Sequence, residues 1–216
     1  MILMEHPLFM DYGPIPGIAI FAVLMAVSGG FFSYQVIKAT RLVRLGKPDN
    51  RFDNWGARIS EVITGWLGQK KVLKDRVAGG IHVMMFWGFL MLSTDMFDLA
   101  TGNWFSHNLL PEVLNGPWNI MVEFGYFIAF IGCTLALIRR TIFTPDKLKG
   151  KSQIEGNAIL MLIMTITTTA FVVEAGESGV SKTWEPIGYW VAQTIIPSTT
   201  LVVVAYWAHM LAIATF

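Results

Sequence analysis

Charged residues are scarce in this sequence, at 14% of 216 residues, whereas 54% of the residues are hydrophobic. An ordinary soluble domain carries about a quarter charged residues, so the composition excludes that class. The apolar residues fall in blocks of about twenty, which is the length of a helix that spans a bilayer. The sequence therefore predicts an integral membrane protein that is surrounded by lipid and does not bind nucleic acid.

Cysteine is almost absent, with Cys133 as the single example, and it lies inside an apolar block. A disulfide framework needs paired cysteines, and an iron–sulfur cluster is held by about four cysteine thiolates. The sequence therefore excludes both a disulfide scaffold and a cluster that is held by this chain alone.

The apolar blocks predict an all-α membrane protein, with five transmembrane helices in one domain that covers residues 1–216. The spans are expected at about 14–37, 77–99, 118–138, 157–173 and 199–216. Residues 55–67 (WGARISEVITGWL) place apolar residues at helical spacing, which is typical of a helix on the membrane surface. A short segment with Trp and Tyr, residues 187–196, is expected to be a second interfacial helix. Because the chain ends inside an apolar run, we expect a truncated sequence or one domain of a longer protein.

Positive charge is distributed very unevenly along the chain. Of the 16 Lys and Arg residues, all but Lys182 fall in the segments 38–76 and 139–151. Basic loops remain in the cytoplasm by the positive-inside rule. We therefore expect the N-terminus outside, the C-terminus in the cytoplasm, and a multi-pass location in the cell inner (cytoplasmic) membrane.

Two histidines fall inside predicted spans, His82 in the second and His209 in the last. An ionisable side chain at membrane depth is costly and is a functional-site hypothesis by default. A six-coordinate haem takes two imidazoles from facing helices of a bundle. We expect His82 and His209 to bind the iron of a b-type haem. The alternative for His82 and for His209 is a histidine satisfied by a hydrogen bond to a neighbouring helix. The other two histidines, His6 and His107, are expected to be ordinary loop histidines.

His82 and His209 are predicted to lie at different depths in the membrane. His82 lies about 8 Å inside the inner boundary and His209 about 15 Å inside the outer one, at the helical rise per residue. They can share one haem only if the last helix is tilted or ends soon after Phe216. Gly79, Gly80 and Gly88 are expected to leave room for the macrocycle, and ordinary small-residue packing is the alternative.

Carboxylates near membrane depth could carry protons from a quinol site at the outer face. Asp95, Asp98, Glu123 and Glu174 all lie towards the predicted outer ends of spans. Asp95 is the deepest on the helix that carries His82, and we take it as the first candidate for a proton path. The alternative is that these groups are interfacial carboxylates that reach water.

The motifs GIHVMMFWGF in the second span and AHMLAIATF in the last carry a family resemblance. With five spans and a basic first cytoplasmic loop, the chain resembles the gamma (cytochrome b) subunit of respiratory nitrate reductase. It more closely resembles the N-terminal membrane domain of heterodisulfide-reductase-related iron–sulfur oxidoreductases. The resemblance aligns His82 with the first histidine of the family's second span and His209 with the first of its last span. Leu92 stands where the family has a second histidine in span two, so the pattern for a second haem is incomplete.

This resemblance implies haem b, in one or two copies, with quinone as the membrane substrate and iron–sulfur clusters on a missing domain or partner. We therefore expect an electron-transfer module of a respiratory oxidoreductase, working between quinone or quinol and cytoplasmic iron–sulfur carriers. The alternatives are a cofactor-free membrane anchor for a peripheral enzyme and a small transporter. A transporter predicts an inverted internal repeat, which the sequence does not show.

Overall fold

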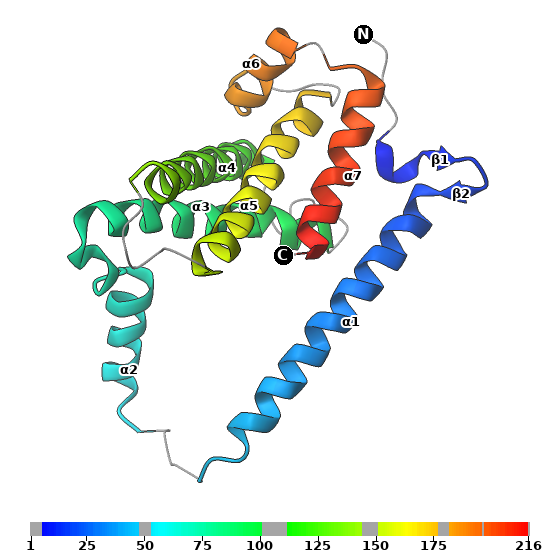
Figure 1. Ribbon diagram of the computed structural model, residues 1–216. Coiled ribbons are helices and arrows are strands. Elements are labelled where there is room, and N and C mark those ends of the chain that lie inside the picture. Colours follow the sequence, from blue (N-terminus) through cyan, green and yellow to red (C-terminus); the bar gives the residue numbers. More distant parts are fainter. Residues whose placement is uncertain are drawn as a thin grey trace.

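The computed structural model describes residues 6–47, 53–100, 112–143, 151–176, 182–195 and 197–215. These residues are helical apart from turns and a two-stranded hairpin near the N-terminus (Figure 1). In chain order the elements are η1 (Pro7–Phe9), β1 (Asp11–Tyr12), β2 (Ile15–Pro16), α1 (Gly17–Val43), α2 (Trp55–Glu61), the π-helix η2 (Val62–Leu67), η3 (Val72–Lys74), α3 (Arg76–Ala100), α4 (Glu112–Thr141), α5 (Lys151–Gly176), α6 (Pro186–Ile195) and α7 (Thr199–Thr215).

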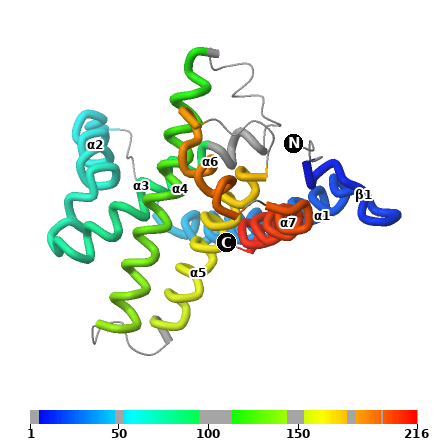
Figure 2. Tube along the Cα trace, turned by 90° about the horizontal axis from the view of Figure 1, so that it is seen from above, coloured from blue at the N-terminus to red at the C-terminus, as the bar shows by residue number. Residues whose placement is uncertain are grey.

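Four helices build the core. α4 packs against α3 on one side and α5 on another, and α5 in turn packs against α7. Figures 1 and 2 show α5 between α4 and α7, with α6 near one end of this group. The buried apolar residues come from all four helices: Leu92, Val122, Tyr126, Ala129, Ile166 and Ala212. The short helix α6 contacts α5 and α4.

Small residues allow the close approach of α3 and α4. A methyl group at Gly88 would lie 2.7 Å from the backbone nitrogen of Ala129, and one at Gly125 would lie 2.6 Å from the Cβ of Met91. Helix pairs in membranes commonly approach through such small residues, because van der Waals packing is then a main source of their stability. The α3–α4 pair is therefore fixed by shape, with Ala129 only 1% exposed.

α1 stands apart from the bundle. It contacts η1, β2 and α7, and in Figure 1 it runs as a long rod away from the other helices. Its side chains are mostly exposed and apolar, and neither Gly29 nor Gly30 has another atom near the place of a Cβ. Apolar exposure on this scale is unfavourable in water and natural in lipid.

By length and composition, four described helices can cross a membrane: α1, α3, α4 and α5. α7 is apolar but has only 17 residues. The helical class and multiple candidate spans agree with the sequence prediction. The helices are longer than expected at their polar ends: α1 continues to Val43, and α5 begins at Lys151.

The start of α4 differs from the prediction in an instructive way. The span was expected from residue 118, directly after Pro117, but the helix begins at Glu112 and contains that proline. A proline lacks the N–H for one helical hydrogen bond and disturbs an interior turn. Pro117 lies about one and a half turns inside α4, so the helix runs through it without the hydrogen bond that an N–H at this position would donate to the carbonyl of Val113.

Candidate functional site

His209 lies in the interface between α7 and α5, where only 8% of it is exposed. Its Nδ1 is 2.9 Å from the carbonyl oxygen of Ile166 and 3.1 Å from the Oγ1 of Thr169. A carbonyl oxygen can only accept, so Nδ1 carries the proton and donates it. The neutral ring then has its lone pair on Nε2, the arrangement that second-shell carbonyls impose on metal-binding histidines.

The partners of His209 are held by α5 itself. The Oγ1 of Thr169 donates back to the carbonyl of Thr165 at 2.6 Å, so it faces His209 as an acceptor. Such back-bonding is the usual way for threonine to satisfy its hydroxyl within an apolar helix. One turn of α5 therefore fixes both the tautomer and the plane of the imidazole.

His82 has a different environment, at the start of α3 on an exposed face. Its ring stacks on Phe86 of the same helix, with centroids 6.5 Å apart and an angle of 21° between the planes. Phe86 meets Trp66 of η2 edge-on at 5.7 Å. Among the described residues no hydrogen bond to the His82 imidazole is found, so both of its nitrogens are available.

The described contacts do not bring the two histidines together. His209 contacts α5, whereas His82 contacts its own helix, which packs against α4. Haem iron accepts imidazole nitrogen as a ligand, so the residue type at both positions is compatible with the predicted haem. That the two face one iron stays a prediction.

The three predicted glycines separate into two kinds. Gly79 lies against η3, where a methyl group would be 2.5 Å from the carbonyl oxygen of Val72, and Gly88 lies against Ala129. Both serve chain packing in this structure. Around Gly80 nothing lies within 4 Å of the Cβ position. Of the three, Gly80 is the residue beside His82 that leaves open space for a ring.

Of the predicted membrane-depth carboxylates, Glu123 on α4 has the most clearly defined contacts. Asp95 and Asp98 belong to α3, but their side chains lie outside the described part of the chain. Glu123 is only 3% exposed, and its Oε1 accepts the backbone N–H of Gly188 at 2.6 Å. Gly188 is in the first turn of α6, where free N–H groups and the helix dipole favour a negative partner. Glu123 therefore anchors α6 to the core.

Two further contacts complete this anchor. The Nδ2 of Asn119 donates to the Oε1 of Glu185 at 2.7 Å, just before α6 begins. A methyl group at Gly188 would lie 2.6 Å from the Cδ of Glu174. Sequence reasoning named Glu123 and Glu174 as membrane-depth carboxylates but missed their common contact with Gly188. The sequence indicates this contact only through Glu123, a glutamate inside an apolar run. Its partner Gly188 is 65 positions away in the sequence.

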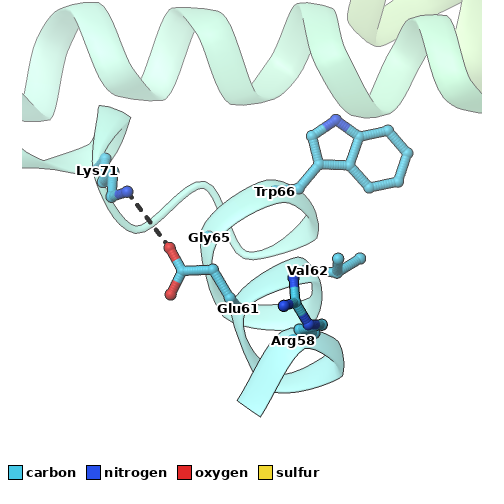
Figure 3. Close-up of a pocket in the computed structure, with 6 residues that line it drawn as sticks. All are labelled: Arg58, Glu61, Val62, Gly65, Trp66 and Lys71. Carbon is cyan, nitrogen blue, oxygen red and sulfur yellow. Dashed lines mark hydrogen bonds and ion pairs between the residues drawn. The ribbon is translucent and has the colours of Figure 1, made fainter. Parts of the chain in front are cut away.

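A shallow, open hollow of about 500 Å³ lies on the α2–η2 segment. Figure 3 shows its lining, with the Trp66 ring above it and the Lys71 ammonium directed at Glu61. The Nζ of Lys71 is 3.3 Å from Glu61 Oε1, and Arg58 is 2.8 Å from Asp53 Oδ1. Both cations of this hollow are therefore already paired. Its amphipathic lining agrees with the predicted surface helix.

The fold defines a class: a helical protein with several apolar, membrane-length helices and a buried imidazole whose Nε2 has no hydrogen-bond partner among the described residues. Over 215 residues the chain is 24% identical to the probable iron-sulfur-binding oxidoreductase FadF of Bacillus subtilis (strain 168), covering 91% of this chain and 29% of FadF. Over 177 residues it is 28% identical to the EtfAB:quinone oxidoreductase of Syntrophomonas wolfei subsp. wolfei (strain DSM 2245B / Goettingen), covering 77% of this chain and 24% of that protein.

The chain spans less than a third of the length of either relative. No family model matches it. No solved structure matches it either. Its distant homologues are oxidoreductases, one of them named as iron–sulfur-binding, which agrees with the coarser part of the predicted resemblance and with an electron-transfer role.

Proposed function

We propose that this chain is the haem b-containing membrane domain of a quinone-linked oxidoreductase, and that it exchanges electrons between quinone and iron–sulfur carriers. His209 carries the proposal, because it is buried in an apolar bundle with Nδ1 donating to Ile166, and its Nε2 has no partner in the described part of the chain. A buried imidazole in this tautomer is suited to a metal ion. The name of the Syntrophomonas relative supports quinone as the membrane substrate and EtfAB as the source of electrons behind the carriers.

The proposed topology has five spans, with α7 as the fifth. The N-terminus lies outside and the C-terminus in the cytoplasm of the inner membrane, because all basic residues except Lys182 fall in two segments. On this arrangement His82 lies near the cytoplasmic face, where an iron–sulfur partner would dock. His209 lies deeper, on a helix that starts at the outer face.

The residues of the chain have distinct parts in this proposal. His209 would bind iron through Nε2, while the Ile166 carbonyl and the Thr169 hydroxyl orient its ring. His82 would supply an axial nitrogen beside the open space at Gly80. Haem b, when bound, would supply a one-electron iron couple. Each histidine would hold haem iron through one imidazole nitrogen, at one shared iron or at two.

A pyridine haemochrome assay on the purified protein tests the cofactor. We expect haem b in the wild-type protein. In the reduced-minus-oxidised absorption spectrum of the native protein, we expect the low-spin bands to be lost in His209→Ala and in His82→Ala, while both variants still insert into the membrane. His107→Ala, which changes a predicted loop histidine, is the matched control and keeps the spectrum. Absence of haem at any stoichiometry would overturn the proposal and favour a cofactor-free anchor.

A further inference from the structure

The N-terminal segment folds against α7 close to His209. The Oη of Tyr12 donates to the carbonyl of Pro7 at 3.0 Å and accepts the Nε1 proton of Trp207 at 2.8 Å. The rings of Tyr12 and Trp207 also meet edge-on, with centroids 5.7 Å apart. These contacts fix the turn that carries His6 beside the middle of α7.

Tyr206 is the polar group that this arrangement leaves unsatisfied. It is 3% exposed, and its buried Oη has no hydrogen-bond partner among the described residues. Its ring meets His6 edge-on at 5.1 Å and Trp207 at 5.2 Å. Buried hydroxyls are nearly always hydrogen-bonded, so an isolated one indicates a missing partner. The hydroxyl groups of Tyr12 and Tyr206 thus differ: the first donates one hydrogen bond and accepts another, whereas the second has no partner within the described ranges.

His6 offers a second donor next to Tyr206. Its Nδ1 accepts the N–H of Leu8 at 3.3 Å, so the proton of the neutral ring is on Nε2. Burial lowers the pKa of His6, which keeps the ring neutral at physiological pH.

The chemistry of these groups selects the ligand. An O–H and an N–H donor lie among aromatic rings, and the contacts that join these residues include no lysine or arginine. Without a cation, a carboxylate or phosphate is poorly matched, whereas a planar neutral molecule with carbonyl oxygens fits both the donors and the rings.

We propose that His6 and Tyr206 donate hydrogen bonds to the carbonyl oxygens of a quinone head group that binds at the middle of α7. This inference rests on the proposed function and adds the place of the quinone. Tyr206 precedes His209 by three residues, about 4.5 Å along the helix axis, so the ring would bind next to the proposed iron ligand.

Direct binding of a short-tailed naphthoquinone to the purified chain in detergent, followed by calorimetry, tests the site. Tyr206→Phe removes only the hydroxyl and should weaken binding about tenfold, as expected for one lost hydrogen bond to a buried group. Tyr34→Phe makes the same change on an exposed part of α1 and should leave binding unaltered. Equal affinity of Tyr206→Phe and wild type would overturn the assignment, as would the absence of wild-type binding.

His6→Ala and His6→Gln test the second donor. The alanine variant should bind the naphthoquinone more weakly, and glutamine, which keeps an N–H donor, should restore part of the affinity. Haem content is measured on the same samples, which separates the two proposals. Binding that depends on Tyr206 in a haem-free protein supports the quinone site while the haem assignment fails. A haem spectrum that changes in Tyr206→Phe with quinone affinity intact would mean that Tyr206 serves the haem, and would overturn the site.

Discussion

The imidazole of His209 lies between two packed helices, whereas the imidazole of His82 lies on an open face of α3. Both residues follow glycine or alanine-rich apolar sequence, and both fall within predicted spans. The difference comes from the neighbours: α5 supplies Ile166 and Thr169 to His209, and Phe86 of the same helix supplies a ring to His82. An apolar run thus predicts the depth of a side chain but not the face on which it lies.

This difference has a consequence for the role of each residue. His209 has one tautomer and one orientation before any cofactor binds, so little ordering is needed when its Nε2 binds a metal. His82 has no such hydrogen bond among the described residues, so its ring is held less firmly, by stacking on Phe86. The two histidines therefore differ in preorganisation, and substitutions on each side can measure by how much.

The largest expected effect concerns the two faces of α3. Gly88→Leu would force bulk into the contact with Ala129 and should lower the free energy of unfolding by about 3 kcal/mol, the upper part of the range for overpacked sites. Gly80→Leu makes the same change where the Cβ position is open, and should stay within about 0.5 kcal/mol. Denaturation by SDS, followed by circular dichroism, measures both. Equal losses would show that the face beside His82 is closed.

The next effect compares the histidines themselves in the haem-free protein. His209→Ala leaves the Thr169 hydroxyl facing a cavity and should cost about 2 kcal/mol of unfolding free energy. His82→Ala removes an exposed ring and should cost less than about 0.5 kcal/mol. The same SDS titration reports both. A cost for His82→Ala as large as that for His209→Ala would contradict the open environment described for His82.

Much of the helical layout could be predicted from sequence, because hydrophobic length depends on local composition. The segments around residues 55–67 and 187–196 were both expected to be helical, and the structure has α2 with η2 in the first and α6 in the second. Helix ends were less accurate. α4 begins at Glu112 and passes through Pro117, although the sequence predicts a span that starts after this proline.

The contacts that define the candidate site depend on residues distant in the sequence. Glu123 meets Gly188 across 65 positions, and His209 meets Ile166 across 43. Nothing within either local segment encodes its partner. Gly88 packs against α4 in the structure, and its predicted role in leaving room for a cofactor stays a prediction. The side chain of Asp95 lies outside the described part of the chain, so its role in a proton path stays a prediction.

A smaller effect is expected at Asp75, where α3 begins, about two turns before His82. The Oδ1 of Asp75 accepts the N–H groups of Val77 and Ala78 at 3.2 and 3.0 Å, and its Oδ2 is 3.6 Å from Arg139. Asp75→Ala removes this cap and should cost about 1 kcal/mol. Asp75→Asn keeps a capping oxygen and loses only an exposed ion pair, which is worth less than about 0.5 kcal/mol. The thermal midpoints of both variants test this order, and the reverse order would give the ion pair the main role.

The smallest expected effect is on the other histidine, through one of its two acceptors. Thr169→Val keeps the shape of the side chain and removes the oxygen 3.1 Å from His209 Nδ1, but the Ile166 carbonyl at 2.9 Å remains. Because the proton keeps an acceptor, the loss should be about 0.5 kcal/mol, below that of a full buried hydrogen bond. Thr165→Val removes a hydroxyl that donates only to Met161 on the exposed side of α5, and is the matched control.

The ¹⁵N chemical shifts of the His209 imidazole show whether Thr169 or the Ile166 carbonyl fixes the tautomer. If Nδ1 remains protonated in Thr169→Val, the backbone carbonyl alone fixes the tautomer, and His209 is preorganised by a group that no side-chain substitution can remove. A change of tautomer would instead assign the orientation of the ring to Thr169. In that case the backbone would not fix the tautomer of His209, and the two histidines would differ only in burial.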